Sequence, residues 1–224
     1  MSGAVDRTRR DLVRMLALGV PVLGSTACAT VSAPASASLP DFVSLVERVS
    51  PSVVAIGDST QTLASGFAVG ETLVVTAAHA VQTLGSGAVV TSARGRHAAR
   101  LVGTREQDDL VLLEIGASLP PLSLATMLPR VGEWVVVIGN PFGAGMTVTA
   151  GIVSAAPGAI TATPELARRI QINASVNPGN SGGPVCNLRG EVIGATTTLV
   201  AGGQGIAFAT SALAVRDFLA TVRK

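Results

Sequence analysis

The sequence predicts an all-β protein made of two barrels of six short strands each. Short runs rich in Val, Thr and Ala recur along the 224 residues, and 25 Gly and 12 Pro are spread between them, as expected for strands joined by turns. A proline-rich stretch at residues 119–122, followed by Pro129, divides these runs into six before and six after. Because 48% of the residues are hydrophobic and only 13% are charged, disorder, collagen and a disulfide scaffold are excluded.

The first forty residues are expected to form an export signal and a flexible tether. Residues 8–14 contain the pair Arg9 and Arg10 and resemble a twin-arginine signal, and the apolar run that follows, residues 15–24, is too short to span a bilayer. Four arginines and two aspartates in this segment account for the whole net charge of +2. The balanced remainder predicts no nucleic-acid partner. We expect a periplasmic or extracellular protein.

Two ways of processing this segment stay open. Residues 25–28 resemble a loose lipobox, which would make Cys28 a lipid anchor, whereas Ala35-Ser36-Ala37 offers a signal-peptidase site before Ser38. The other cysteine, Cys186, lies in an apolar run and is interpreted as a small core residue. We expect no disulfide between the two.

From Asp41 onward the elements follow in order. Apolar residues at helical spacing predict a short helix that Pro51 ends, and the same spacing between Leu213 and Val222 predicts a closing helix. Strands are expected at residues 53–56, 64–69, 72–76, 88–91, 98–102, 110–115, 134–138, 146–154, 170–174, 183–186, 192–198 and 205–209. The expected organisation is signal and tether at 1–40, first barrel at 41–118, linker at 119–130, and second barrel with closing helix at 131–224.

Three motifs carry reactive side chains. Ser181 lies among glycines in residues 177–184, His79 follows an apolar strand, and Asp108-Asp109 opens another strand. A nucleophile, a base and an acid are therefore present in the order His, Asp, Ser. The glycines also fit the nucleophile elbow of α/β-hydrolases, but both histidines precede the serine, and this order excludes that fold. No metal-binding cluster or phosphate loop occurs in the sequence, so no cofactor is expected.

These motifs, in this order, resemble the HtrA-type branch of the chymotrypsin-like serine proteases. The similarity extends from about Asp41 to Leu219 and includes the segments at residues 41–54, 65–67, 73–79, 109–113, 138–143, 149–154, 177–184 and 205–209. The resemblance implies a chymotrypsin-like double six-stranded β-barrel.

The resemblance also implies a role for each reactive residue. Ser181 would be the nucleophile, His79 the general base and then acid, and Asp109 the carboxylate that orients the histidine. Asp109 is preferred because it directly precedes the apolar run, which leaves Asp108 as a solvated turn residue. The backbone N–H groups of Gly179 and Ser181 would form the oxyanion hole, with Asn180 held between them.

Substrate preference follows from the same resemblance. Ser175, six residues before the nucleophile, would lie at the bottom of the primary pocket, and Val176 and Ala207 would make that pocket small or medium and apolar, which favours cleavage after Val, Ala or Leu. Substrate backbone is expected to pair with the strand that carries the remaining pocket residues, Ala195, Thr196, Thr197 and Thr198.

Three positions depart from the family pattern, namely Asn173, Thr196 and Ala207, and since the sequence ends at Lys224 we expect no PDZ domain. Together these observations predict an exported serine endopeptidase that acts on unfolded or misfolded polypeptides. Two alternatives stay open, a catalytically silent peptide-binding module and an esterase on the same fold. The arginine-rich segment around His97 is interpreted as a solvated hairpin, and the sequence predicts no oligomeric state.

Overall fold

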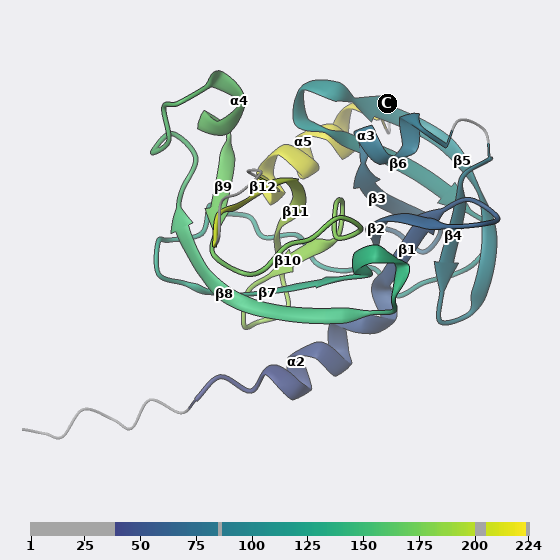
Figure 1. The fold of residues 1–224 in the computed structure, drawn as a ribbon, viewed down its shortest axis with the longest axis horizontal. Coiled ribbons are helices and arrows are strands. Elements are labelled where there is room, and N and C mark those ends of the chain that lie inside the picture. Colours follow the sequence, from purple (N-terminus) through teal and green to yellow (C-terminus); the bar gives the residue numbers. More distant parts are fainter. Residues whose placement is uncertain (1–38, 85–86, 200–204, 223–224) are drawn as a thin grey trace, which may run out of the picture. The chain divides into compact units, whose positions relative to one another are not determined.

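Two closed antiparallel barrels form the body of the protein, as the sequence predicted (Figure 1). The computed structural model describes residues 39–84, 87–199 and 205–222, and both barrels belong to one compact unit, Pro40–Lys224. The first barrel has the strand order β1-β2-β3-β6-β5-β4. Its strands are β1 (Val53–Gly57), β2 (Thr62–Ala68), β3 (Leu73–Ala77), β4 (Val89–Ser92), β5 (Gly95–Arg105) and β6 (Leu110–Ile115).

The second barrel has the strand order β10-β11-β12-β9-β8-β7. Its strands are β7 (Trp134–Gly139), β8 (Thr147–Ala155), β9 (Arg169–Ile172), β10 (Pro184–Cys186), β11 (Val192–Leu199) and β12 (Ala207–Ser211). In Figure 1 the first barrel lies to the right and the second to the left. Each of the twelve expected runs therefore became a strand, although β5 is about twice as long as the expected run.

Helices flank the strands. The two expected ones are α2 (Phe42–Val49) and α5 (Ala212–Val222). Short helical segments that the sequence had not predicted are α3 (Ala78–Gln82), α4 (Pro164–Ala167), η1 (Ser50–Ser52), η3 (Glu106–Asp108) and η4 (Pro141–Gly143). Segments of three to five residues are too short to show helical periodicity, which explains why they were missed.

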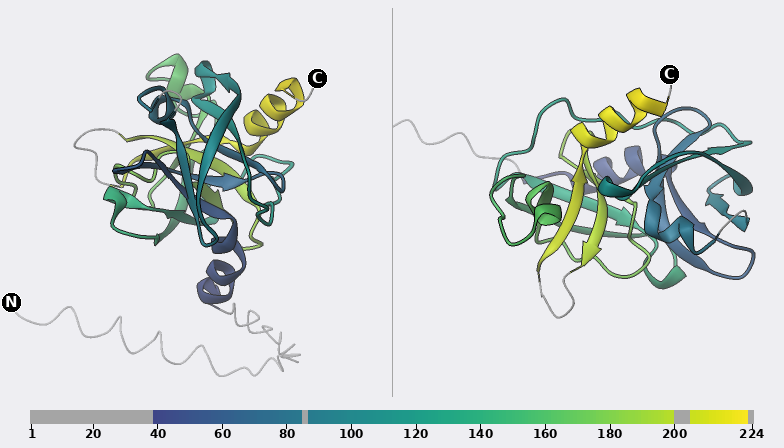
Figure 2. Two further views of the ribbon diagram at one scale, coloured as in Figure 1. Left: turned by 90° about the vertical axis from the view of Figure 1, so that its right-hand side faces the viewer. Right: turned by 90° about the horizontal axis from the view of Figure 1, so that it is seen from above.

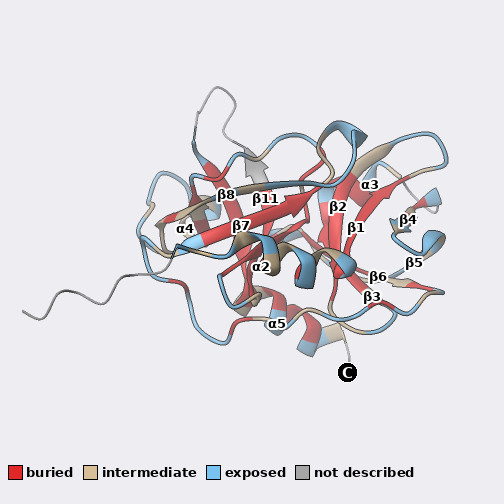
Figure 3. Ribbon diagram, turned by 90° about the horizontal axis from the view of Figure 1, so that it is seen from below, coloured by how far each residue is buried: buried red, intermediate tan, exposed pale blue. Residues whose placement is uncertain are grey.

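Some strands are apolar at nearly every position because each of their faces packs into a different core. Along β6, Leu110 and Leu112 enter a core between the barrels, whereas Val111 and Leu113 point into the first barrel. β7 divides its side chains in the same way between the shared core and the interior of the second barrel. Figure 3 shows β7 and β3 as buried along most of their length. The shared core is what joins the two barrels.

Both long helices pack on this shared core. α2 contributes Leu45 and Val49, and α5 contributes Val215 and Phe218. α5 contacts β11 and β12 of the second barrel and also β5 and β6 of the first (Figure 2). Arg105 of β5 lies over the ring of Phe218, 5.5 Å from its centroid, so α5 connects the barrels in addition to closing the chain.

Of the two cysteines, Cys186 lies in the described part of the structure. Cys28, the arginine pair and both candidate cleavage sites lie outside the described residues. Cys186 is free and fully buried in the shared core, and this burial raises the pKa of its thiol to about 12. Its thiol is therefore inert at neutral pH. Among the described helices, none is both long enough and apolar enough to cross a membrane.

Candidate active site

A histidine and an aspartate of the first barrel form a hydrogen-bonded pair. His79 lies on α3, directly after β3, and Asp109 lies directly before β6, the strand that pairs with β3. One carboxylate oxygen of Asp109 accepts the backbone N–H of His79 at 2.9 Å, and the other lies 2.8 Å from Nδ1 of the ring. Because a carboxylate only accepts, Nδ1 carries the proton and Nε2 keeps its lone pair.

A third donor reaches the same carboxylate from the second barrel. The hydroxyl of Thr197, on β11, donates to Oδ2 of Asp109 at 2.5 Å. Burial of the carboxyl acts to raise the pKa of Asp109, but the hydrogen bonds from His79 and Thr197 outweigh it and hold that pKa below its ordinary value. The hydrogen bond to Asp109 in turn raises the pKa of His79, against the opposing effect of burial. The contacts thus stabilise Asp109 as the carboxylate and favour the protonated form of His79.

Asp109 adopts a backbone conformation that is uncommon for residues other than glycine. Its φ of 55° and ψ of 44° lie in the left-handed region, at the end of η3. For a non-glycine residue this conformation costs about 1 kcal/mol or more, and it persists only where the surroundings hold it. The N–H of Asp109 donates to the Glu106 carbonyl at 2.9 Å and its carbonyl accepts from Ala78 at 3.1 Å, so backbone contacts on both sides keep the turn in place.

Asp108 does not behave as the sequence analysis expected. The residue is buried, its carboxylate lies 3.6 Å from Arg105, and its carbonyl accepts hydrogen bonds from Arg169 and Thr210 of the second barrel. The prediction of a solvated turn residue is therefore wrong, because the second barrel covers η3. The carboxylate that meets the histidine is that of Asp109.

Ser181 lies in the loop between β9 and β10, where the barrels meet. Its carbonyl accepts the N–H of Ser65 from β2 at 2.9 Å, and the N–H of the next residue, Gly182, donates to Thr196 on β11 at 2.6 Å. The hydroxyl of Ser181 donates to the Thr197 carbonyl at 3.5 Å, and this is its one hydrogen bond within the described part of the chain. Thr197 therefore contacts both Ser181, through its carbonyl, and Asp109, through its hydroxyl.

Two glycines of this loop lie where a side chain would collide. Gly179 has a φ of +99°, and a Cβ there would come within 2.5 Å of the Asn140 carbonyl. Gly182 has a φ of +81°, and a Cβ there would strike Thr76 and Ala77 of β3. The glycines thus allow the serine loop to lie directly against both the first barrel and the segment after β7.

A buried serine of the first barrel fixes the shape of this loop, and the sequence analysis assigned it no role. The hydroxyl of Ser65 donates to the Gly179 carbonyl at 2.7 Å and accepts the N–H of Asn140 at 2.8 Å. The neighbouring Pro178 carbonyl accepts the N–H of Phe142 at 2.9 Å. Ser65 was missed because it contacts a residue 114 positions away, and no local pattern marks such a contact.

The backbone amides of Gly179 and Ser181 have no acceptor among the described residues, so both remain available as donors. Asn180 between them is buried; its N–H donates to Asn177 at 3.0 Å and its carbonyl accepts from Gly183 at 2.9 Å and from the hydroxyl of Thr196. Its side-chain oxygen is buried without a partner in the described structure. Asn180 is therefore held as part of the turn, by its backbone.

The residues expected to line the substrate pocket lie in different surroundings. Ser175 is exposed and its carbonyl accepts the hydroxyl of Thr149 at 2.7 Å, while Val176 is half-buried against the core of the second barrel. Ala195 and Ala207 are buried in cores. The hydroxyl of Thr196 contacts the serine loop. These three side chains, like that of Thr197, face the interior, and the side chain of Thr198 lies outside the described residues.

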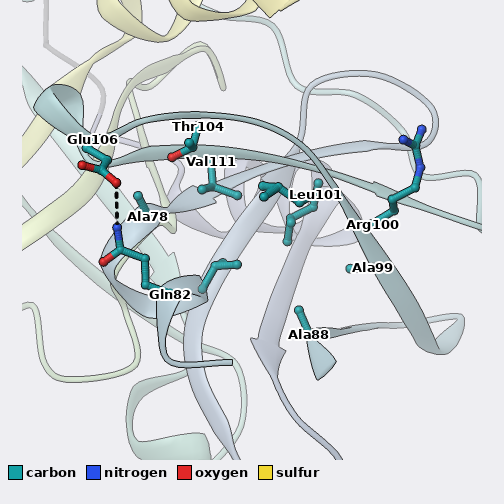
Figure 4. Close-up of a pocket in the computed structure, with 11 residues that line it drawn as sticks. Ala78, Gln82, Ala88, Ala99, Arg100, Leu101, Thr104, Glu106 and Val111 are labelled. Atoms are coloured by element: carbon teal, nitrogen blue, oxygen red, sulfur yellow. Dashed lines mark hydrogen bonds between the residues drawn. The ribbon is translucent and has the colours of Figure 1, made fainter. Parts of the chain in front are cut away.

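A cavity of about 590 Å³ lies behind the helix that carries His79. Its lining is mainly apolar and includes Ala78 of α3, Leu101 of β5 and Val111 of β6, which Figure 4 labels, together with Val81 of α3. At its edge Gln82 donates to Glu106 at 3.3 Å, as the dashed line shows. α3 thus borders a cavity, and it is held by its buried Ala78, Ala80 and Val81 together with the hydrogen bonds to Asp109.

No group of three or more His, Cys, Asp or Glu side chains that could hold a metal occurs in the described part of the chain.

This arrangement defines the class of the protein. A double barrel joins a histidine–aspartate pair on one barrel to a glycine-flanked serine on the other, and a model of the trypsin-like peptidase domain matches residues 64–194. The chain belongs to the trypsin-like peptidase family.

Its relatives narrow the class further. The chain is 37% identical over 216 residues to a probable periplasmic serine endoprotease, DegP-like, of Hahella chejuensis, a match that covers 76% of this chain and 46% of the relative. It is 44% identical over 153 residues to a DegP-like endoprotease of Brucella suis, covering 65% of this chain and 30% of the relative. These relatives confirm the resemblance to HtrA-type serine proteases.

A solved structure shows the same fold. The crystal structure of a serine endoprotease from Yersinia pestis superposes with a TM-score of 0.71 at 29% sequence identity, covering 85% of this chain and 67% of that one. The chain spans about half the length of the curated relatives it matches, at 46–48% for the first of them.

Proposed function

We propose that the chain is a serine endopeptidase in which Ser181, His79 and Asp109 form the catalytic triad. The observation that carries this proposal is the hydrogen bond from His79 Nδ1 to Asp109, made where Thr197 also contacts Ser181. In the described structure the Ser181 hydroxyl donates to the Thr197 carbonyl, and in the proposed active state it would instead donate to Nε2 of His79. Catalytic hydrogen bonds of this kind often form only when substrate is bound.

In the proposed reaction Nε2 of His79 takes the proton of the Ser181 hydroxyl while the oxygen attacks the peptide carbonyl. The same nitrogen then protonates the leaving amine, and water hydrolyses the acyl-enzyme by the reverse roles. Asp109 stays ionised and stabilises the imidazolium, and the hydrogen bond from Thr197 supports that charge state.

The oxyanion of the tetrahedral intermediate would be bound by the two free amides of Gly179 and Ser181. Ser65 supports this role because it fixes the Gly179 carbonyl, and Phe142 because it fixes the Pro178 carbonyl. These bonds hold the peptide planes on both sides of Gly179, and the bonds from Gly183 and Thr196 to the Asn180 carbonyl hold the plane that carries the Ser181 N–H, so both donors are oriented before the substrate arrives.

We further propose that the protein is exported and cleaves unfolded polypeptides after small or medium apolar residues. The relatives named as periplasmic endoproteases support export, together with the arginine-containing signal and apolar run at the N-terminus. Ser175 and Val176 support an apolar pocket without an acid, because neither could pair with a substrate lysine or arginine. Lipid attachment at Cys28 remains the alternative to cleavage before Ser38.

Labelling with a fluorophosphonate tests the function directly, since only a competent triad is phosphonylated. We expect the intact protein to be labelled at Ser181, and the Ser181→Ala variant, as the matched control, to remain unlabelled. The fragments of a digested unfolded protein should then end mainly in Val, Ala or Leu. Failure of the purified wild-type chain to react would favour a silent peptide-binding module, and cleavage of esters without cleavage of unfolded protein would favour an esterase.

The raised pKa of His79 predicts the acid limb of the pH profile. His79 must be neutral to accept the serine proton, and the bond to Asp109 raises its pKa above the ordinary value of 6.5, so kcat/KM should fall as the pH drops through a midpoint above 6.5. Steady-state rates on a peptide substrate between about pH 5 and 9 measure this midpoint. A midpoint below 6.5 would contradict the assigned partner of His79.

A further inference from the structure

The described structure contains a buried cation that the proposed mechanism does not use. Arg169 is the first residue of β9, and only 7% of its surface is exposed. It does not take part in the ion pairs of the described residues. A buried charge requires strong hydrogen bonds, so the groups that accept from the Arg169 guanidinium show what it stabilises.

Those groups lie on η3, the turn of the first barrel that leads into Asp109. Nη1 of Arg169 donates to the Asp108 carbonyl at 2.8 Å, and Nη2 donates to the Gln107 carbonyl at 3.4 Å. The same Nη1 contacts the hydroxyl of Thr210 on β12, which itself donates to the Asp108 carbonyl at 2.7 Å. Two donors of the second barrel therefore hold one carbonyl of the first.

This carbonyl belongs to the peptide group that enters Asp109. Holding it fixes the plane of that peptide and thereby limits φ of Asp109, the angle that lies at 55°. The left-handed turn aims the carboxylate at the backbone N–H and at Nδ1 of His79. Because a cavity lies behind α3, a shift of Asp109 would carry His79 with it.

The charge of Arg169 acts in the same direction. Burial lowers the pKa of Arg169, and the negative charges of the Asp109 and Asp108 carboxylates oppose that change.

We propose that Arg169 is a positioning residue for catalysis, which sets the backbone turn of Asp109 from the opposite barrel and so orients the histidine. This inference rests on the proposed function. One side chain of the second barrel would thus determine the geometry of the acid–base pair on the first barrel.

The test compares Arg169→Met, Arg169→Lys and the neighbouring Arg168→Met. Arg168 is exposed, and within the described part of the chain its guanidinium donates to the Gln107 carbonyl at 3.2 Å, so its loss leaves both donors to Asp108 in place. Rates are normalised to the fraction of sites labelled by fluorophosphonate, which removes the effect of unfolded protein. We expect Arg169→Met to lower kcat by about 10- to 100-fold with KM changed by less than about 3-fold, as for a misaligned catalytic group. Arg168→Met should stay near wild type.

The pH profile separates positioning from packing. Loss of the Arg169 bonds should weaken the hydrogen bond from His79 Nδ1 to Asp109, the bond that raises the pKa of His79, so the acid limb of Arg169→Met should move to lower pH. Arg169→Lys can still donate to the Asp108 carbonyl and should keep the limb while recovering part of kcat. Wild-type kcat per labelled site and an unmoved acid limb in Arg169→Met would overturn the proposal, even if the melting temperature fell. If Arg169→Met does not fold, Thr210→Val serves instead, because it removes the second donor to the Asp108 carbonyl. A lowered kcat per labelled site in Thr210→Val would support the positioning of Asp109 from the second barrel, and a wild-type kcat would overturn it.

The His79 Nδ1 proton provides a readout independent of turnover. In NMR spectra its strongly downfield resonance reports the bond to Asp109, and we expect it in wild type and Arg168→Met but broadened or lost in Arg169→Met. If wild type gives this resonance but no labelling, the proposed function fails while the positioning of the pair can still be judged. If wild type is labelled and the resonance is unchanged in Arg169→Met, only the role of Arg169 fails.

Discussion

Replacing Ser181 by alanine, or His79 by alanine, is expected to lower kcat by about six orders of magnitude, because each change removes a group without which the acyl-enzyme cannot form. The fold should be retained, since Ser181 makes one weak side-chain hydrogen bond and the side chain of His79 is about half exposed. The measurement is turnover of a peptide substrate together with thermal unfolding of each variant.

The double variant provides the control. Residues that act as one unit lose their effect together, so Ser181→Ala with His79→Ala should be hardly slower than either single variant. Losses that add in free energy would show that the two residues act separately and would reject the triad.

Asp109→Asn is expected to lower kcat by about four orders of magnitude. The amide can still adopt the left-handed conformation, for which Asn is among the best-suited residues, so the turn should survive. An amide, however, presents a donor where the carboxylate accepted from Nδ1, which favours the wrong tautomer of His79 and removes the charge that stabilises its protonated form. Rates normalised to folded protein measure this loss.

Asp108→Asn is the matched control for this variant. Its carboxylate faces Arg105 at 3.6 Å and does not contact His79, so we expect kcat to change by less than about tenfold. If Asp108→Asn were the crippled variant and Asp109→Asn the active one, the acid of the triad would have to be reassigned.

The strands were predictable because their signal is local. Along β6 and β7 an unbroken run of apolar residues indicates that both faces of the strand are buried, and such runs are visible in the sequence itself. The five-residue α3 was not predictable, since a single turn has no periodicity and depends on the bonds that Asp109 makes to its first residues.

The residues of the candidate site also fall into a group that local sequence predicts and a group that it does not. His79, Asp109 and Ser181 stand in motifs with their own sequence context, and the structure brings the first two into contact. The roles of Ser65 and Arg169 could not be read from the sequence, although Ser65 lies in the segment 65–67 that resembles the family, because their partners lie in the other barrel and only the tertiary fold brings them together. Asp108 was misjudged for the same reason, since the residues that bury it come from β9 and β12.

The distribution of the site over two barrels has a consequence for the life of the chain before it is complete. His79 and Asp109 precede the linker, whereas Ser181, Thr197 and Arg169 follow it, so a ribosome finishes the strands of the first barrel well before it makes the serine. During that interval the nascent chain holds an imidazole and a carboxylate but lacks the nucleophile and the donors that aim the pair. With the proposed triad, hydrolysis would therefore require the second barrel to dock, and a chain still being synthesised could not attack its own unfolded remainder.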